Sequence, residues 1–190
     1  MVKFFVKRPV GLWCPITLLI GLFIISVFAP AVAFNSHITE DPTRVLRKYL
    51  SLDQKGVRLD AASLEVVKSY VAWQEEPAWG HVVVIADFQI EHDVTKWEII
   101  DDLEAKIPVT FEVLGWMHWE SVTFVSDSHQ ETHWFHIKAQ YDRWQIADPL
   151  LPPHVGRRRL IDFVRWTELN EPEAKKKALF ASLQKQLKAK

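Results

Sequence analysis

The strictest pattern in this chain is an alternation of apolar and polar side chains from Leu103 to Val113. Successive side chains of a β-strand point to opposite faces of a sheet, so the segment predicts a strand with one buried and one wet face. Pro108 lies in the polar set of this alternation and has no amide hydrogen to donate, which predicts an edge or a bulge there. Gly115 predicts a further bulge or bend. The chain is therefore expected to build a sheet with one face against a core.

Further strands are expected on both sides of this one. Ser126-Asp127-Ser128-His129 has turn chemistry and predicts a hairpin tip, and Tyr141-Asp142-Arg143 predicts a tight turn. The residues from Asp93 to Asp102 predict a polar connection. The other expected strands cover residues 81–91, 119–125, 132–140 and 144–147.

Helical spacing precedes and follows the expected sheet. Asp41-Pro42 predicts a helix start, with Asp41 as the N-cap and Pro42 in the first turn, and Gly56 predicts its end. A second helix is expected from near Asp60 or Ser63 to just before Pro77. Residues 155–166 and 171–190 predict two more helices, the last with only a narrow apolar stripe. The fold class is α+β.

The first 33 residues have the three parts of a secretory signal. Lys3, Lys7 and Arg8 precede an uncharged apolar run from Val10 to Phe28, and Ala31-Val32-Ala33 provides small residues for cleavage after Ala33. This pattern predicts a secreted or periplasmic protein. The alternative is an uncleaved membrane anchor, with the domain facing away from the cytoplasm and touching the membrane only through this segment.

The composition after the leader excludes some functions. Removing 33 of the 190 residues leaves 157. The leader holds three of the 23 basic residues and none of the 24 acidic ones, so the net charge changes from −1 to −4. Such a chain offers no electrostatic basis for binding nucleic acid. The single cysteine, Cys14, lies in the leader, so the rest of the chain has no disulfide or thiol chemistry, and no cofactor is expected.

Two short motifs resemble the NTF2-like (SnoaL-like) superfamily. One is the ending Ala139-Gln140-Tyr141-Asp142-Arg143-Trp144-Gln145-Ile146-Ala147-Asp148-Pro149, and the other is Tyr49-Leu50 followed by Asp53 and Gly56. The resemblance runs from about Asp41 to about Val155. It implies N-terminal helices packed on a curved antiparallel sheet that forms a cone around a pocket. The implied domains are residues 34–154, with residues 155–190 as a C-terminal helical extension; a cystatin-like fold is the alternative.

Pockets in that superfamily host isomerases, dehydratases, cyclases and purely binding members, so the fold does not choose a function. His133 shares strand parity with Phe135 and Ile137 and is expected to face the core, where it is the best candidate for a general acid or base. Asp87 is its candidate partner. These two residues support the alternative function, a cofactor-independent lyase or isomerase.

A metal site is not expected from histidine spacing. His129, His133 and His136 lie close in sequence, with His118 on the preceding strand. His133 and His136 are three residues apart and therefore point to opposite faces of a strand. Only His129 and His133 share parity.

Aromatic residues give the leading expectation, an exported non-catalytic domain that binds a small ligand or a protein partner in the cell envelope. A self-associating module, such as a homodimer formed through Trp119 and Trp134, is a further alternative. Arg157-Arg158-Arg159 is either a contact for anionic lipid or phosphate or a solvated helix start. The expected ligand-binding residues are Trp73, Trp79, Trp116, Trp119 and His118.

Overall fold

The computed structural model describes residues 41–59 and 63–189, which belong to one compact unit. The expected signal peptide, residues 1–33, lies outside these ranges. None of the helices in the described ranges has the length and apolar character that a membrane crossing requires.

The first helix forms as the sequence predicts. Helix α1 spans Pro42–Gln54, and the Asp41 side chain accepts a hydrogen bond from the Thr43 amide at 2.8 Å. Gly56, with φ of 70°, follows the helix in the left-handed conformation that favours glycine. The stripe that α1 buries consists of Val45, Leu46, Tyr49 and Leu50.

The second helix is much shorter than expected. After the 3₁₀ turn η1 (Val57–Leu59), helix α2 covers only Ser63–Val67. The chain beyond it is drawn onto the sheet, where Ile146 donates to the Tyr70 carbonyl and accepts from the Ala72 amide. Pairing with an open strand edge therefore replaces the helix that the apolar spacing favours.

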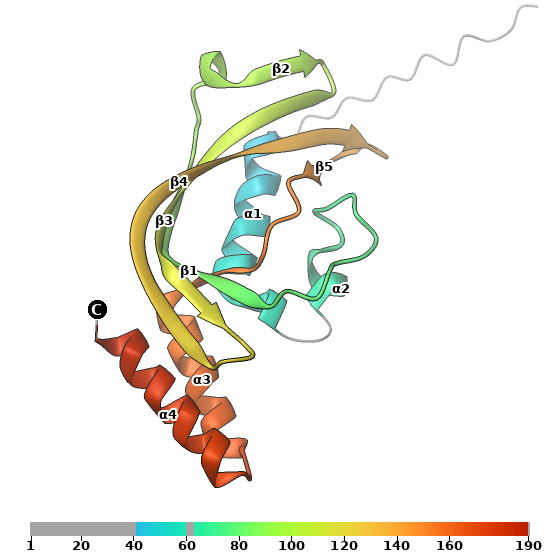
Figure 1. Ribbon diagram of the computed structural model, residues 1–190. Helices are drawn as coiled ribbons and strands as arrows, with labels where there is room; N and C mark the ends of the chain where they lie inside the picture. The colour runs from blue at the N-terminus through green and yellow to red at the C-terminus, as the bar shows by residue number, and fades with distance from the viewer. Residues whose placement is uncertain (1–40, 60–62, 190) are drawn as a thin grey trace, which may run out of the picture. The chain divides into compact units, whose positions relative to one another are not determined.

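The sheet has the order β5-β4-β3-β1-β6, with β2 also paired to β3. All pairs are antiparallel except β1–β6, which is parallel. Figure 1 shows β3 and β4 curving around α1. The strands are β1 (His81–Ile90), β2 (Glu98–Asp101), β3 (Glu104–His118), β4 (Thr123–Gln140), β5 (Arg143–Asp148) and β6 (His154–Gly156), with a 3₁₀ turn η2 (Val94–Lys96) before β2.

The expected hairpin tip at residues 126–129 is wrong. These residues lie inside β4, where Ser126 pairs with Gly115 and His129 pairs with Val113. The chain instead reverses between β3 and β4 at residues 119–122, where Val122 has a φ of 50°. A bulge between Val113 and Gly115 absorbs the mismatch, so the polar run stays in the ladder.

Pro108 sits where its missing amide is tolerated. The pairing of β1 with β3 ends at Val109, and the pairing of β2 begins at Lys106. Pro108 therefore lies in the gap between two neighbours and only accepts a hydrogen bond there, from the Glu91 amide. The prediction of an edge or a bulge therefore holds only locally, since β3 has partners on both sides and Pro108 pairs with Trp134 of β4.

Each face of the sheet contributes to its own hydrophobic core. Helices α3 (Arg157–Asn170) and α4 (Ala174–Lys188) pack against the second face through Leu160, Val164, Leu183 and Leu187. This arrangement confirms the predicted α+β class, with N-terminal helices on a curved sheet, and fits an NTF2-like cone. The concave-face core, which contacts α1, includes Tyr49, Leu50, Val83, Ile85, Ile107, Phe111, Phe135, Ile137 and Ile146.

Candidate functional site

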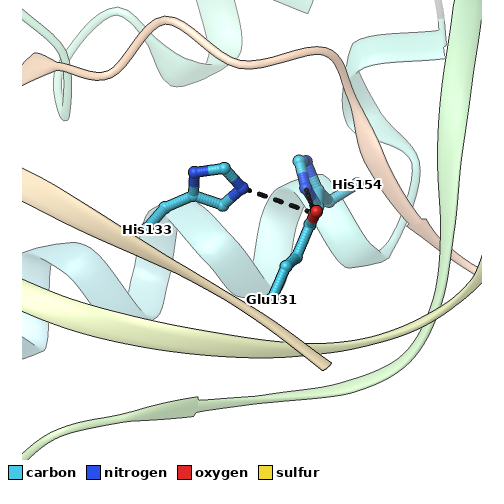
Figure 2. A group of neighbouring side chains, drawn as sticks. All are labelled: Glu131, His133 and His154. Carbon is cyan, nitrogen blue, oxygen red and sulfur yellow. Dashed lines mark ion pairs between the residues drawn. The ribbon is translucent and has the colours of Figure 1, made fainter. Parts of the chain in front are cut away.

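A group of two imidazoles and one carboxylate lies at the border of the concave-face core. Glu131 and His133 are two residues apart on β4 and so share a face, and His154 begins β6. Glu131 Oε1 lies 3.4 Å from His133 Nε2 and 3.5 Å from His154 Nε2 (Figure 2). Strands β4 and β6 are not neighbours in the sheet, so its curvature brings these side chains together.

His154 is held in place from three directions. Its side chain is 4% exposed, its ring lies 4.4 Å from that of Phe111, and its Nδ1 lies 2.8 Å from the Pro152 carbonyl oxygen. Its backbone amide donates to Asp53 Oδ2 at 2.9 Å. Asp53 is itself buried against the Arg58 guanidinium, at 3.1 Å.

Glu131 is a carboxylate surrounded by imidazoles. Its Oε2 lies 3.6 Å from His129 Nε2, in addition to the two contacts of Oε1. The interaction with His154 is the largest cause that lowers the pKa of Glu131 to about 2; partial burial opposes it, and His133 adds to it. The carboxylate is therefore ionised at neutral pH.

A cationic cavity of about 560 Å³ lies between the end of α1 and the start of α3. Its charged lining is Lys55, Arg157, Arg158, Arg159 and Asp162, and its apolar lining is Ile85, Ala86 and Leu114. No carboxylate of the described residues forms an ion pair with Arg157 or Arg158.

The approach of two helix ends builds this cavity. Gly156 precedes α3, and a Cβ there would lie 3.1 Å from the Gln54 carbonyl oxygen, so glycine permits the close contact. Arg159 Nε donates to the Lys55 carbonyl at 3.0 Å and ties the start of α3 to the end of α1. The positive N-terminal end of α3 adds to the charge of the cavity.

A second, smaller cavity adjoins the first. Its volume is about 270 Å³, and Leu114 and Arg157 line both cavities. Phe124 and Leu187 add apolar side chains to its lining, and Ser128 adds a hydroxyl. The two cavities together place a cationic mouth beside an apolar recess.

The expected catalytic pair is not brought together. His133 lies beside Glu131 and His154, whereas the Asp87 carboxylate accepts hydrogen bonds from the Gln54 side chain and the Phe88 amide. No hydrogen bond or ion pair joins Asp87 to His133 in the part of the chain that the structure describes.

The expected aromatic ligand site is divided among several places. Trp79 and Trp119 line one cavity of about 490 Å³, beside Arg58 and Glu76. Trp73 packs edge-on against Tyr49 in the concave-face core. Trp116 lies against the His129 ring, and His118 against His81.

The two outer tryptophans also differ. Trp119 is covered by Phe163 of α3, at 5.9 Å between ring centroids, while Trp134 is 48% exposed. A homodimer remains a prediction. His136 faces away from His133, as its parity predicts, and pairs with Glu104.

Comparison with known proteins adds little to this picture. No protein-family model and no curated protein matches the chain. Among solved structures, the chain is similar to an NTF2-like protein of unknown function from Shewanella oneidensis MR-1, at 11% identity. The alignment covers 56% of this chain and 95% of that one, with a TM-score of 0.30.

Sequence reasoning missed Glu131 and His154 for different reasons. Glu131 has the parity of His133, so the alternation in β4 contained the signal needed to find it. His154 follows Pro152-Pro153 at the end of the expected sheet, and only the parallel pairing of β6 with β1 brings it to the concave face. The pattern of residues around His154 in the sequence cannot predict such a long-range contact.

Proposed function

We propose that this chain is an exported, non-catalytic domain that binds a small anionic ligand with an apolar tail, in the cationic cavity at the start of α3. The supporting observation is the gathering of Lys55 and Arg157, Arg158 and Arg159 around an apolar floor. Its volume of about 560 Å³ falls within the usual range for small-ligand pockets.

The charges of the cavity favour an anion. A chain of net charge −1 places four cations and one carboxylate, Asp162, around a single cavity. Guanidinium groups bind carboxylates and phosphates through paired hydrogen bonds. Since Arg157 and Arg158 have no ion-pair partner among the described carboxylates, their charge is available to a ligand.

The apolar recess favours a ligand with a tail. Leu114 and Arg157 border both cavities, so a headgroup held by the arginines lies next to Phe124 and Leu187. The export proposed from the first 33 residues puts the domain in the envelope or outside the cell. None of the cavities described here is lined by His133 or Asp87, which gives less support to an enzyme built on that pair.

Calorimetric titration of the purified protein with dodecanoate tests this function. We expect saturable binding that the double variant Arg157→Gln/Arg158→Gln weakens at least ~10-fold, because charge-assisted hydrogen bonds are lost. Arg165→Gln is the matched control, since Arg165 is an exposed arginine of α3 outside the cavity lining. A parallel titration with inorganic phosphate separates headgroup binding from tail binding.

Two results would count against the proposal. One is equal affinity of the double variant and the parent for dodecanoate. The other is that neither dodecanoate nor inorganic phosphate binds saturably to the parent protein.

A further inference from the structure

The Glu131 group lies at the concave-face core, and none of its three residues lines the cationic cavity. We propose that Glu131, His133 and His154 bind one divalent transition-metal ion of the zinc class, with water in the remaining position. The donor atoms are one carboxylate oxygen and two imidazole nitrogens, which all lie within 4.8 Å of one another. Histidine and glutamate are standard zinc ligands, and two histidines with one glutamate form a known catalytic zinc set.

A contact with a backbone carbonyl fixes the tautomer of His154. Its Nδ1 lies 2.8 Å from the Pro152 carbonyl oxygen, which can only accept a hydrogen bond. The Nδ1 atom must therefore carry a proton, and Nε2 of the neutral ring carries a lone pair. A carbonyl bound to the far nitrogen of an imidazole is the usual way in which a metal-binding histidine is oriented.

The lone pair on His154 Nε2 lies beside Glu131. The His154 Nε2 atom is buried and has no hydrogen-bond partner among the described residues. It faces Glu131 Oε1 at 3.5 Å, and the His133 Nε2 atom lies 3.4 Å from the same oxygen. Two facing acceptors need a positive charge between them: either the proton of a His154 imidazolium, the state that favours the ionised Glu131, or a metal ion. A shared metal ion satisfies both acceptors and also engages His133.

The distances fit a small ion. Donors at about 2.1 Å from a tetrahedral zinc ion lie about 3.4 Å from one another. The separations of 3.4 and 3.5 Å between Glu131 and the two imidazoles match this value. Only the two imidazoles need to approach each other to complete the set.

The donor types and their exposure define the class of ion. Calcium and magnesium prefer shells of oxygen ligands, whereas imidazole suits zinc, nickel, copper and iron. His154 is buried, but the side chains of Glu131 and His133 are 28% and 31% exposed. The ion can therefore enter from the exposed side, and a water molecule can occupy the fourth position there. The Phe111 ring closes the inner side.

A proton is the competing occupant. Protonation of His154 Nε2 would give a buried imidazolium paired with Glu131, with no need for metal. The two occupants are distinguished by metal titration, because an imidazolium pair leaves the protein without saturable affinity for zinc.

Binding of Zn²⁺ and Co²⁺ to the full chain tests the site. The experiment uses a Cys14→Ser background, so that the thiol of the leader cannot bind the ion. We expect one Zn²⁺ per chain and visible Co²⁺ absorption typical of a tetrahedral site. Glu131→Gln and His133→Gln are each expected to weaken Zn²⁺ binding at least ~100-fold, above the usual loss for an outer partner of a ligand.

His136→Gln is the matched control. His136 lies on the same strand, also pairs with a glutamate, Glu104, and faces the opposite side of the sheet. It should leave Zn²⁺ affinity within about 3-fold of the parent, since it contacts none of the proposed donors. Circular dichroism of each variant checks the fold, and the two variants at partly exposed positions avoid the risk of substituting buried His154.

Two outcomes would overturn the proposal. The first is no saturable Zn²⁺ binding by the folded Cys14→Ser protein. The second is Zn²⁺ affinity that Glu131→Gln and His133→Gln leave unchanged while both remain folded.

Discussion

At the residue scale, the Arg58 guanidinium links α1 to the segments that follow it. It donates to Asp53 at 3.1 Å, to Glu76 at 3.0 Å, to the Tyr49 hydroxyl at 3.0 Å and to the Leu151 carbonyl at 2.7 Å. Burial raises the pKa of Asp53, and the positive charge of Arg58 opposes that effect. The Arg58–Asp53 pair also positions His154, because Asp53 accepts a hydrogen bond from the His154 backbone amide.

Replacing Arg58 should be among the most costly single changes in the domain. Arg58→Leu leaves Asp53 and Glu76 without their cation, and we expect the free energy of unfolding to fall by about 3–5 kcal/mol. Urea unfolding followed by tryptophan fluorescence measures the loss. Arg47→Leu is the control: Arg47 is exposed and contacts His92, so its loss should be about 0.5 kcal/mol or less. Equal losses in the two variants would contradict the structural role of Arg58.

Glu131 gives the domain a distinct acid sensitivity. Its pKa is about 2 in the folded protein against an ordinary 4.5, so folding favours the ionised form. A depressed pKa contributes stability above the unfolded value, and that stability is lost as pH falls through the folded value. We therefore expect the free energy of unfolding to fall less between about pH 5 and pH 2 in Glu131→Gln than in the parent.

Urea unfolding at several pH values, with chelator present to remove metal, measures this difference. Glu120→Gln, at an exposed turn position, is the control and should keep the pH dependence of the parent. A Glu131→Gln variant with the full acid sensitivity of the parent would show that the carboxylate is not held by the imidazoles.

At the element scale, the long hairpin of β3 and β4 shows what the sequence can and cannot predict. The alternation from Leu103 to Val113 predicted a half-buried strand because burial on one face imposes a period of two. The reversal at residues 119–122 was missed because Ser126 to His129 has equally good turn chemistry. Only pairing with β3, through the bulge at Gly115, decides between the two positions. Strand β6 and the short α2 likewise depend on partners distant in sequence.

Gly115 is the residue that fixes this register. Its φ is 141°, and a Cβ there would lie 2.1 Å from the Val125 carbonyl oxygen. Gly115→Ala should therefore lower the free energy of unfolding by at least about 2 kcal/mol, through backbone strain and the clash. In Gly80→Ala, where a Cβ meets nothing within 4 Å, the change should stay within about 0.5 kcal/mol. Thermal or urea unfolding compares the two, and a tolerated Gly115→Ala would argue against the bulge.

At the scale of the whole molecule, the fold carries two different candidate sites. The concave face holds α1 and the Glu131 group, and the start of α3 forms the cationic cavity near the C-terminal end of α1. Sequence reasoning identified His133 and the three arginines as separate features. Their functional neighbours, His154 for one and Lys55 with Leu114 for the other, come from distant segments and follow only from the fold.

Export is also a property of the whole chain. The predicted cleavage after Ala33 means that protein recovered from the envelope or the medium should begin at Phe34. Mass spectrometry of the intact chain measures its start directly. A mass that includes the leader in exported protein would favour the alternative, an uncleaved anchor.

The proposed ligand site is tested most directly by following backbone-amide NMR signals during titration of the purified protein with dodecanoate. We predict saturable shifts concentrated at Arg157, Arg158 and Leu114, where the two cavities meet. Saturable shifts confined to the concave face around Glu131 and His133, or no saturable shift at all, would contradict the proposed function.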